Sequence, residues 1–560
     1  MVDKVTVEVI KNAAIYASEE MGVVLRNTAY SPNIKDRLDH SCAILAPNGD
    51  LVAQAEHIPV HLGSMSVGVR NTFNFLGKTG EGFDPGDVVL VNDPYIAGTH
   101  LNDLLLMKPV YYNGEMIGIV SNKAHHVDVG GYVPGSIGGG VEELVQEGTI
   151  IPPVKIMKSG EFNKDLLRLI ESNVRTPNYF KGDLKAQIAA LNVGERRVLE
   201  LASKYGSRAV TEAWDEILSY TERYTRSILR SLNVGGDYEA EDYMETPGGT
   251  VNIRVKLSFS EGMLRVDFSG THSQVRYPIN AVYGVTVSAV SFALKTILDP
   301  IMPMNQGFLR VVGIYAPKGS LVNPSKPAPV SGGNVETSQR IADVVYRALA
   351  KALTEKVPAA SCGTMSNMAI GGVNPDATRW AFYETIACGS GGRPCCDGVD
   401  AVQTNMTNTL NTPIELLERE YPILFTEYSI RSGSGGHGKY RGGNGVVRAF
   451  KVLQGDTRLT VTGERVKTRP WGLEGGLEGM SAEYLVVKKS GGILRLGSKD
   501  SVTLDEGDVV MVKTPGGGGY GDPCSRNSAD IRRDIVDGKV DEGWIRVLEE
   551  MCGKRFKFIV

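Results

Sequence analysis

The spacing of apolar and polar residues predicts that the first part of the chain is rich in β-sheet. Residues 5–25 have the apolar spacing of an amphipathic helix, and the pattern changes to short apolar runs between residues 39 and 55. Further along, two apolar runs between residues 104 and 126 are separated by Asn113-Gly114, a dipeptide typical of a two-residue hairpin turn. We therefore expect a first helix followed mainly by strands.

The rest of the chain divides into a helical stretch and a longer mixed region. Residues 163–232 are charged and helix-periodic with few internal glycines, which predicts a helical arm. After Gly235 the chain returns to alternating strands, interrupted by apolar helices, and its last third is rich in glycine. The predicted fold class is α+β, as one body made of a sheet-rich region at 1–160, a helical arm at 161–235, an α/β core region at 236–420 and a glycine-rich β region at 421–560.

Composition narrows the class of protein. Hydrophobic residues make up 42% of the 560 residues and charged residues 22%, as in ordinary globular proteins. The formal net charge of -4 provides no broad basic surface for a phosphate backbone, so nucleic acid is not an expected partner. No segment has the roughly 18 consecutive apolar residues of a membrane span, and acids within the first apolar stretch distinguish it from a signal peptide. We expect a cytoplasmic protein with no membrane partner.

The cysteines and glycines do not form a familiar functional motif. Seven cysteines, an odd number without a CxxC pair, predict no disulfide framework, and the adjacent Cys395 and Cys396 are interpreted as buried reduced thiols. Two GxGxxG spacings begin at Gly433 and Gly516, but the sequence after each does not predict a helix that could bind a phosphate. The sequence thus contains no self-contained nucleotide motif.

The clustering of histidines is the most informative chemical feature. Six of the eight histidines fall in the first quarter of the chain, close to several aspartates. If Asn113-Gly114 forms a two-residue turn, Asn102 faces His125 and Asp103 faces Ala124 across a hairpin. The residues gathered at the open end of this hairpin are His100, Asp103, His125 and His126.

This group has the composition of a metal site. Two imidazoles and one carboxylate suit iron, manganese or zinc and leave coordination positions open. A regular hairpin places Asp103 on the face of His126 and opposite to His125, so a strand irregularity before Leu104 is required if His125 is the ligand. From the residues alone, a metal site and a hydrogen-bonded polar cluster both remain open.

A second pair of histidines, His57 and His61, lies four residues apart. Pro59 between them disfavours a regular helix, which makes a loop that lines a pocket the better interpretation.

Several motifs resemble the hydantoinase B/oxoprolinase family in sequence and in order. They are RLDHSCAI at 37–44, HIPVHLGSM at 57–65, GDVVLVNDPYIAGTHLNDL at 86–104, DFSGT at 267–271, NTPIELLEREYP at 411–422, SGGHGKYRGGNG at 434–445 and TPGGGGYGDP at 514–523. The resemblance covers nearly the whole chain. One departure is His40, where many relatives have an aromatic residue.

The resemblance implies a subunit of a hetero-oligomer that opens cyclic amides such as 5-oxoproline or a hydantoin. A separate hydantoinase A-like subunit is then expected to bind ATP and phosphorylate the amide carbonyl oxygen, and the activated intermediate is attacked here. In the related acetone carboxylase subunit manganese is bound by a His-x-x-Asp and a downstream histidine, which correspond to His100, Asp103 and His125.

Roles for the remaining polar residues complete the prediction. We expect His126 and Asp128 to orient water or carry its proton, and we expect the substrate to be bound by His57, His61 and Asp39. The expected cofactor is a divalent manganese, zinc or iron ion, with ATP bound by the partner. Two alternatives are carboxylation of a small ketone and a non-catalytic scaffold for the ATPase.

Overall fold

A seven-stranded antiparallel sheet forms the centre of the N-terminal half. The computed structural model describes residues 2–55 and 57–555. The strands follow the order β2-β1-β5-β4-β3-β6-β7. They are β1 (His40–Leu45), β2 (Leu51–Gln54), β3 (Val88–Val91), β4 (Asp103–Tyr112), β5 (Glu115–His125), β6 (Val154–Lys158) and β7 (Glu161–Phe162).

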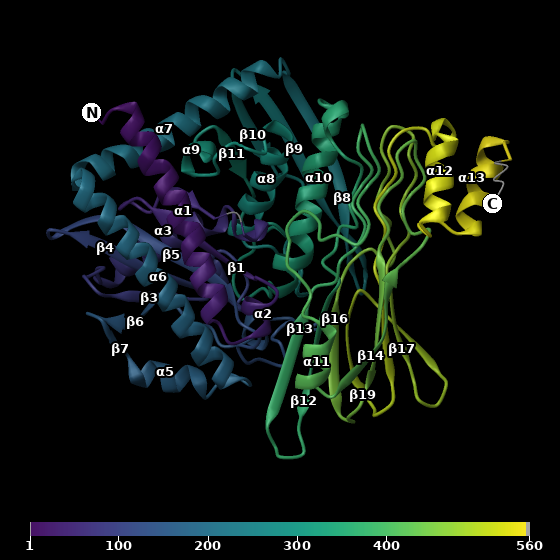
Figure 1. The fold of residues 1–560 in the computed structure, drawn as a ribbon, viewed down its shortest axis with the longest axis horizontal. Helices are drawn as coiled ribbons and strands as arrows, with labels where there is room; N and C mark the ends of the chain where they lie inside the picture. Colours follow the sequence, from purple (N-terminus) through teal and green to yellow (C-terminus); the bar gives the residue numbers. More distant parts are fainter. Residues whose placement is uncertain (1, 56, 556–560) are drawn as a thin grey trace.

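Helices cover both faces of this sheet (Figure 1). Along β4, Leu104 and Leu106 belong to the core shared with one set of helices, whereas Leu105 and Met107 pack in the core of the opposite helix. Because alternate residues point to opposite faces, both sets must be apolar, which explains the continuous apolar run. The first set is α1 (Lys4–Thr28), α6 (Pro177–Tyr205) and α7 (Ser207–Ser231), and the opposite helix is α3 (Ser64–Thr79).

The predicted helical arm is therefore a layer of the main body. Helix α6 contacts both β4 and β5, and α7 also contacts β5. The apolar stripes of these helices are buried against the sheet instead of projecting from it. Shorter helices in this half are α2 (Pro32–Lys35), α4 (Pro94–Ala97) and α5 (Lys164–Glu171).

A second sheet follows the helices, in the order β11-β10-β9-β8. Helix α10 packs against its strands and against α8, and α8 in turn contacts α3 of the first unit. A π-helical turn at Gly333–Thr337 leads into α10. The elements are β8 (Gly236–Thr246), β9 (Gly249–Ser260), β10 (Met263–Asp267), α8 (Tyr283–Leu298), α9 (Gln306–Leu309), β11 (Val312–Tyr315) and α10 (Ser338–Ala350).

Two further sheets make up the C-terminal part. One has the order β13-β12-β16-β19 and the other β14-β15-β20-β17-β18. The first of them joins strands from both sides of residue 420, where the sequence predicted a boundary between two regions. The strands are β12 (Asn367–Val373), β13 (Arg379–Glu384), β14 (Ile423–Ile430), β15 (Val446–Val452), β16 (Thr457–Thr462), β17 (Glu483–Val487), β18 (Ile493–Leu496), β19 (Lys499–Leu504) and β20 (Val509–Lys513), with helices α11 (Ile414–Glu420), α12 (Ser528–Val536) and α13 (Glu542–Cys552).

Glycine-rich segments pack backbone against backbone between these sheets and the C-terminal helices (Figure 1). The Gly436 amide donates to the Gly517 carbonyl at 2.9 Å, and the Gly392 amide donates to Gly518 at 2.8 Å. A Cβ atom added to Gly517 would lie 2.0 Å from the Ser390 carbonyl oxygen. Such close approach admits only glycine. The two GxGxxG spacings therefore serve packing.

The cysteine prediction is wrong in two respects. Disulfides join Cys362 to Cys388 and Cys524 to Cys552. Cys395 is exposed, not buried, and Cys396 is partly exposed. The two cysteines of the first disulfide are 26 residues apart in the sequence, and those of the second are 28 residues apart. The fold brings each pair together, and the sequence spacing alone does not reveal the pairing.

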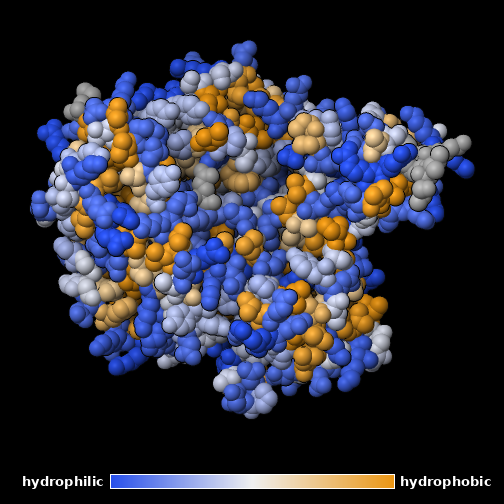
Figure 2. All heavy atoms as spheres, viewed as in Figure 1, coloured by the Kyte–Doolittle hydropathy of each residue, from blue (hydrophilic) through white to orange (hydrophobic). Residues whose placement is uncertain are grey.

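The face shown in Figure 2 is largely hydrophilic, with small apolar groups dispersed over it. Among residues 2–55 and 57–555, no helix combines the length and apolar character needed to cross a bilayer.

Candidate metal centre

The hairpin of β4 and β5 has a bulge that determines which histidine joins the site. Next to the turn Tyr112 pairs with Glu115, but beyond a register shift at Val110 and Tyr111 the pairing moves by one residue. Asp103 consequently lies directly opposite His125. The predicted pairing with Ala124 is corrected, and the required irregularity lies near the turn, not before Leu104. Directly opposed residues share a face, so the bulge places the carboxylate and the imidazole together.

Three donor atoms converge at this end of the hairpin. His100 Nε2 lies 2.9 Å from Asp103 Oδ1 and 3.1 Å from His125 Nδ1, and the last two atoms are 3.2 Å apart. Adjacent corners of an octahedron lie about 3.0 Å apart when metal–ligand bonds are about 2.1 Å long. The triangle therefore has the dimensions of three facial ligands around a single ion.

Hydrogen bonds alone do not account for the three contacts of this triangle. If both imidazole nitrogens donate to Asp103 Oδ1, two N–H groups face each other at 3.1 Å. If His100 donates to His125 instead, the His125 lone pair faces the carboxylate at 3.2 Å. A cation at the centre removes both conflicts, so the donor set fits a divalent metal ion.

The space around the triangle is a small buried chamber. Its volume is about 20 Å³, close to that of one water molecule or ion. One wall comes from the first sheet, and the cover comes from segments more than 200 residues later. The covering residues are Asn334, Val335, Met365, Tyr383, Thr385, Met406 and Thr407.

Burial and mutual attraction determine the charges in the chamber. Burial disfavours an imidazolium at His100, but the Asp103 carboxylate outweighs it and raises the pKa of His100. At His125 burial dominates and lowers the pKa. Burial also disfavours the Asp103 carboxylate, yet the two histidines hold its pKa well below the usual range. A carboxylate and a neutral imidazole are thus present near neutral pH, as metal binding requires.

Tyr383 on β13 holds the His125 ring. The two rings are stacked with centroids 4.9 Å apart and an interplanar angle of 17°. The Tyr383 hydroxyl donates to Asn367 Oδ1 at 2.5 Å, and the Arg37 guanidinium lies 4.9 Å from the same ring. These contacts restrict the orientation of a ligand ring, and nothing in the sequence around Tyr383 indicates this role.

Of the residues predicted to bind substrate, two reach the chamber and one does not. Asp39 lines the chamber, with Oδ2 3.9 Å from His125 Nδ1. His61 also lines it, and its Nε2 lies 3.3 Å from Asp103 Oδ2. His61 ends a 3-10 turn that begins at Pro59, so this segment is a single tight turn. The His57 ring is instead tilted by 55° against the His40 ring, with centroids 4.9 Å apart, and does not line the chamber.

The two residues predicted to be catalytic, His126 and Asp128, are not among the residues that line the chamber. His126 follows His125 and points to the opposite side, where its Nε2 lies 3.0 Å from Gln187 Oε1. Asp128 accepts hydrogen bonds from two loop amides and from Arg175 at 3.0 Å. Both residues stabilise the loop after β5 and neither lines the chamber.

A larger cavity adjoins the chamber. Its volume is about 360 Å³, and His61, Ile58 and Thr407 line both spaces. Apolar side chains such as Phe292 alternate with amide groups along its wall. The size and mixed lining are those of a site for a small organic molecule.

Two buried ionisable groups near the chamber were not singled out from the sequence. Burial lowers the pKa of Lys123 to about 7, and its Nζ donates to Ser64 Oγ at 3.0 Å. Burial raises the pKa of Glu147 to about 7, and its Oε1 accepts two backbone amides at 2.8 Å. Lys123 could have been identified from the sequence, because it lies two residues before His125 on a strand predicted to be apolar. Glu147 follows a loop, and no sequence pattern indicates its burial.

The sequence matches known proteins along most of its length. A family model described as hydantoinase B/oxoprolinase matches residues 3–523. An uncharacterized protein of Methanocaldococcus jannaschii is 56% identical over 538 residues, which are 96% of this chain and 94% of that protein. The 5-oxoprolinase of Dictyostelium discoideum is 36% identical over 93% of this chain, which spans only 40% of that longer protein.

A solved structure agrees with this relationship. The ATP-dependent caprolactamase from Pseudomonas jessenii has a TM-score of 0.90 and 30% sequence identity, covering 98% of this chain and 96% of that chain. A family match across more than nine-tenths of the sequence, together with a shared fold, leads to one assignment. The chain belongs to the hydantoinase B/oxoprolinase family.

Proposed function

We propose that this chain is the ring-attacking component of an ATP-dependent cyclic amide hydrolase. The observation that carries the proposal is the triangle of His100, Asp103 and His125, closed in a chamber that adjoins a cavity for a small molecule. The relatives named 5-oxoprolinase and caprolactamase support the reaction class. The substrate ring then occupies the larger cavity with its carbonyl directed towards the chamber.

The proposal includes a partner that binds ATP. The 5-oxoprolinase of Dictyostelium is more than twice as long as the segment that this chain matches, and the caprolactamase is ATP-dependent by name. We assign ATP binding and phosphorylation of the amide oxygen to a hydantoinase A-like subunit. The two chains together then form a hetero-oligomer.

Amide hydrolysis requires a polarised carbonyl and an attacking water. A divalent manganese, zinc or iron ion would be held by His100, Asp103 and His125 and would supply Lewis acidity there. The chamber excludes bulk solvent, because its lining residues such as His100 and Asp103 are each 1% exposed. Asp39, the remaining carboxylate of the chamber, takes up the proton of the attacking water and returns it to the ring nitrogen as the C–N bond breaks. A second water then releases the phosphate from the resulting acyl phosphate. His126 and Asp128 act indirectly by holding the loop after β5.

Reconstitution tests this function. The purified chain and its ATP-binding partner should consume ATP in step with opening of 5-oxoproline, and His100→Ala should abolish ring opening. Ring opening by the chain alone without ATP would contradict the division of labour. A scaffold would contain no stoichiometric metal, and its Asp103→Asn variant would remain fully active.

A further inference from the structure

Two neighbouring thiols, Cys395 and Cys396, lie outside both the chamber and the cavity beside it. Four of the seven cysteines are joined in two disulfides, and Cys42 is fully buried. Cys395 is exposed and Cys396 is partly exposed, and their Sγ atoms lie 3.4 Å apart. The pair therefore combines two properties that reactive dithiols need, which are access from solvent and contact between the sulfur atoms.

A tight turn brings the two sulfur atoms to the same side. The Arg393 amide donates to the Cys396 carbonyl at 2.9 Å, and the Cys396 amide donates to the Arg393 carbonyl at 3.4 Å. Pro394 and Cys395 therefore form the two-residue tip of a hairpin. In an extended strand adjacent side chains point to opposite faces. The contact between the sulfur atoms thus results from the turn and not from sequence adjacency alone.

Charged groups anchor the segment that follows the turn. The Asp397 carboxylate accepts the Arg441 amide at 2.7 Å, and both of its oxygens bind the Arg526 guanidinium, at 2.7 and 2.8 Å. Arg526 also binds Asp534 on α12 at 2.6 Å. Because the turn is held in this way, the two thiols stay within reach of each other. A reaction that joins them then requires little additional ordering of the chain.

Exposed thiols in mutual contact react as a unit with disulfide reagents. We propose that Cys395 and Cys396 form a reversible oxidation site, which exchanges with low-molecular-weight disulfides and closes to a disulfide between the two neighbours. The inference does not depend on the proposed function, because neither thiol lines the chamber or the cavity.

The exchange takes place in two steps. The thiolate of Cys395, the more exposed of the two, attacks one sulfur of the reagent, which forms a mixed disulfide and expels one reagent thiolate. The thiolate of Cys396 then attacks Cys395 Sγ, which closes the ring and expels the second reagent thiolate. The protein loses two protons and two electrons, and the reagent disulfide is reduced to two thiols. Burial and the neighbouring Cys395 thiol raise the pKa of Cys396, which supports this order.

The new bond should be easier to reduce than the two disulfides already present. Adjacent Cα atoms are about 3.8 Å apart, which is below the roughly 4.4–6.8 Å that an unstrained disulfide spans. The Cα atoms of the two existing disulfides are 6.0 and 5.4 Å apart. Strained and exposed disulfides are the more readily reduced ones. The proposed bond is therefore labile, whereas the other two are structural.

Glutathione disulfide tests the site on the full chain, with mass spectrometry as the readout. The treated protein should lose two hydrogen atoms and retain no glutathione, with the new bond between Cys395 and Cys396 and with Cys42 still reduced. Dithiothreitol should break this bond at about a tenfold lower concentration than the Cys524–Cys552 disulfide requires. No reaction, or a stable glutathione adduct, would overturn the proposal. Reduction of both bonds at the same concentration would overturn their division into labile and structural.

Single variants identify the role of each thiol. Cys396→Ser should retain one glutathione per chain, because the second step is lost. Cys395→Ser should react about tenfold more slowly, because the remaining thiol is partly buried. Loss of two hydrogen atoms in either variant would place the bond elsewhere and contradict the assignment.

Phenylarsine oxide gives a readout without oxidation. Its arsenic bonds to two thiol sulfurs, and its oxygen leaves as water with the two thiol hydrogens. In the presence of excess monothiol, one equivalent should remain bound to the wild-type chain and none to Cys395→Ser or Cys396→Ser. Equal retention by the three proteins would show that the two thiols do not act together.

Discussion

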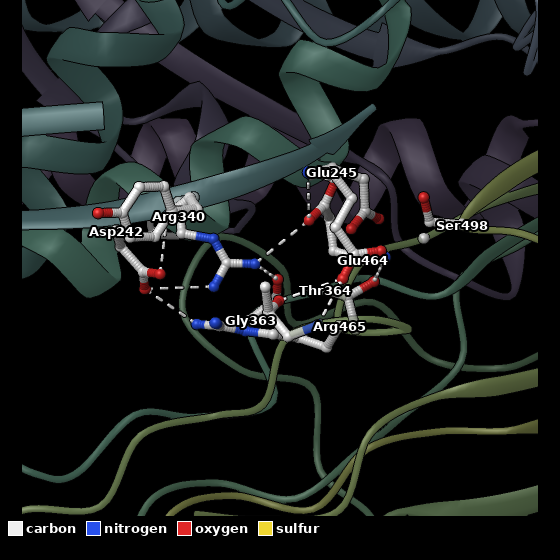
Figure 3. Close-up of polar contacts among 12 residues, drawn as sticks. Asp242, Glu245, Arg340, Gly363, Thr364, Glu464, Arg465 and Ser498 are labelled. Carbon is white, nitrogen blue, oxygen red and sulfur yellow. Dashed lines mark hydrogen bonds and ion pairs between the residues drawn. The ribbon is translucent and has the colours of Figure 1, made fainter. Parts of the chain in front are cut away.

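The chamber around His100 and the cluster around Arg340 are both buried and both rich in ionisable groups, but they differ in how these groups are matched. In the cluster, Arg340 lies 3.4 Å from Asp242 and 3.5 Å from Glu464, so its charge lies between two opposite charges (Figure 3). Its members are Asp242, Glu245, Asp343, Glu464, Arg340, Arg465 and Lys499. It joins strands β8 and β19, helix α10 and the segment after β16.

The chamber has no such balance. His100, Asp103 and His125 direct three donor atoms at one point, and no arrangement of their protons satisfies all three contacts. The comparison teaches that buried charge by itself does not mark a functional site. Unmatched donors that converge on a point do, whereas matched ion pairs indicate a structural role.

The largest expected effect is on catalysis, from Asp103→Asn. The change removes the only carboxylate of the triangle and nearly preserves its shape. We expect ATP-dependent ring opening by the reconstituted pair to fall about a thousandfold or more, because the Lewis acid is lost. Steady-state kinetics measure the fall in ring opening, and elemental analysis measures the loss of the metal. Full activity in this variant would mean that the chamber around His100, like the cluster around Arg340, has only a structural role.

The next effect is on stability, from Arg340→Met. Removing this fully buried cation leaves Asp242 paired only with Arg465 and Glu464 paired only with Lys499, which should cost about 3–5 kcal/mol of unfolding free energy. Denaturant unfolding measures the loss. Arg347→Met, an exposed arginine on the same helix, is the control and should cost less than about 0.5 kcal/mol. If Arg340→Met lost the bound metal but kept its stability, the cluster around Arg340 would be the functional site and the chamber would be structural.

A smaller effect is expected on metal affinity from Tyr383→Phe. The ring that stacks on His125 remains, but its hydroxyl no longer bonds to Asn367. The dissociation constant of the metal, from competition with a chelator, should rise about tenfold. Tyr383→Leu, which also removes the stacking, should raise it further. Equal affinities in all three proteins would mean that Tyr383 does not orient the ligand.

The smallest effect is a change in the pH dependence of stability, through Glu336 between the two clusters. Its Oε1 accepts from Asn367 at 2.7 Å, and burial raises its pKa to about 8. A raised pKa means that the native state holds a proton that the unfolded state releases. This contribution to stability is present below pH 4.5 and is lost as the pH rises towards about 8. Glu336→Gln should flatten that part of the stability profile, and an unchanged profile would contradict the assignment.

The sequence predicted the hairpin and its polar end but not the register. Asn113-Gly114 correctly indicated the turn, and the two apolar runs indicated the strands on either side of it. The bulge near Val110 has no distinctive residue pattern, so the pairing of Asp103 was wrong by one position. His61 and Tyr383 reach the chamber only through tertiary packing, and no local pattern encodes contacts over such separations.

The choice between neighbouring histidines tests the central claim most directly. Metal content per chain should be measured in wild type, His125→Ala and His126→Ala after removal of loosely bound ions. The structure predicts one divalent ion per chain in wild type and His126→Ala and none in His125→Ala, because the bulge directs only His125 to Asp103. Retention of the ion in His125→Ala together with its loss in His126→Ala would contradict the site.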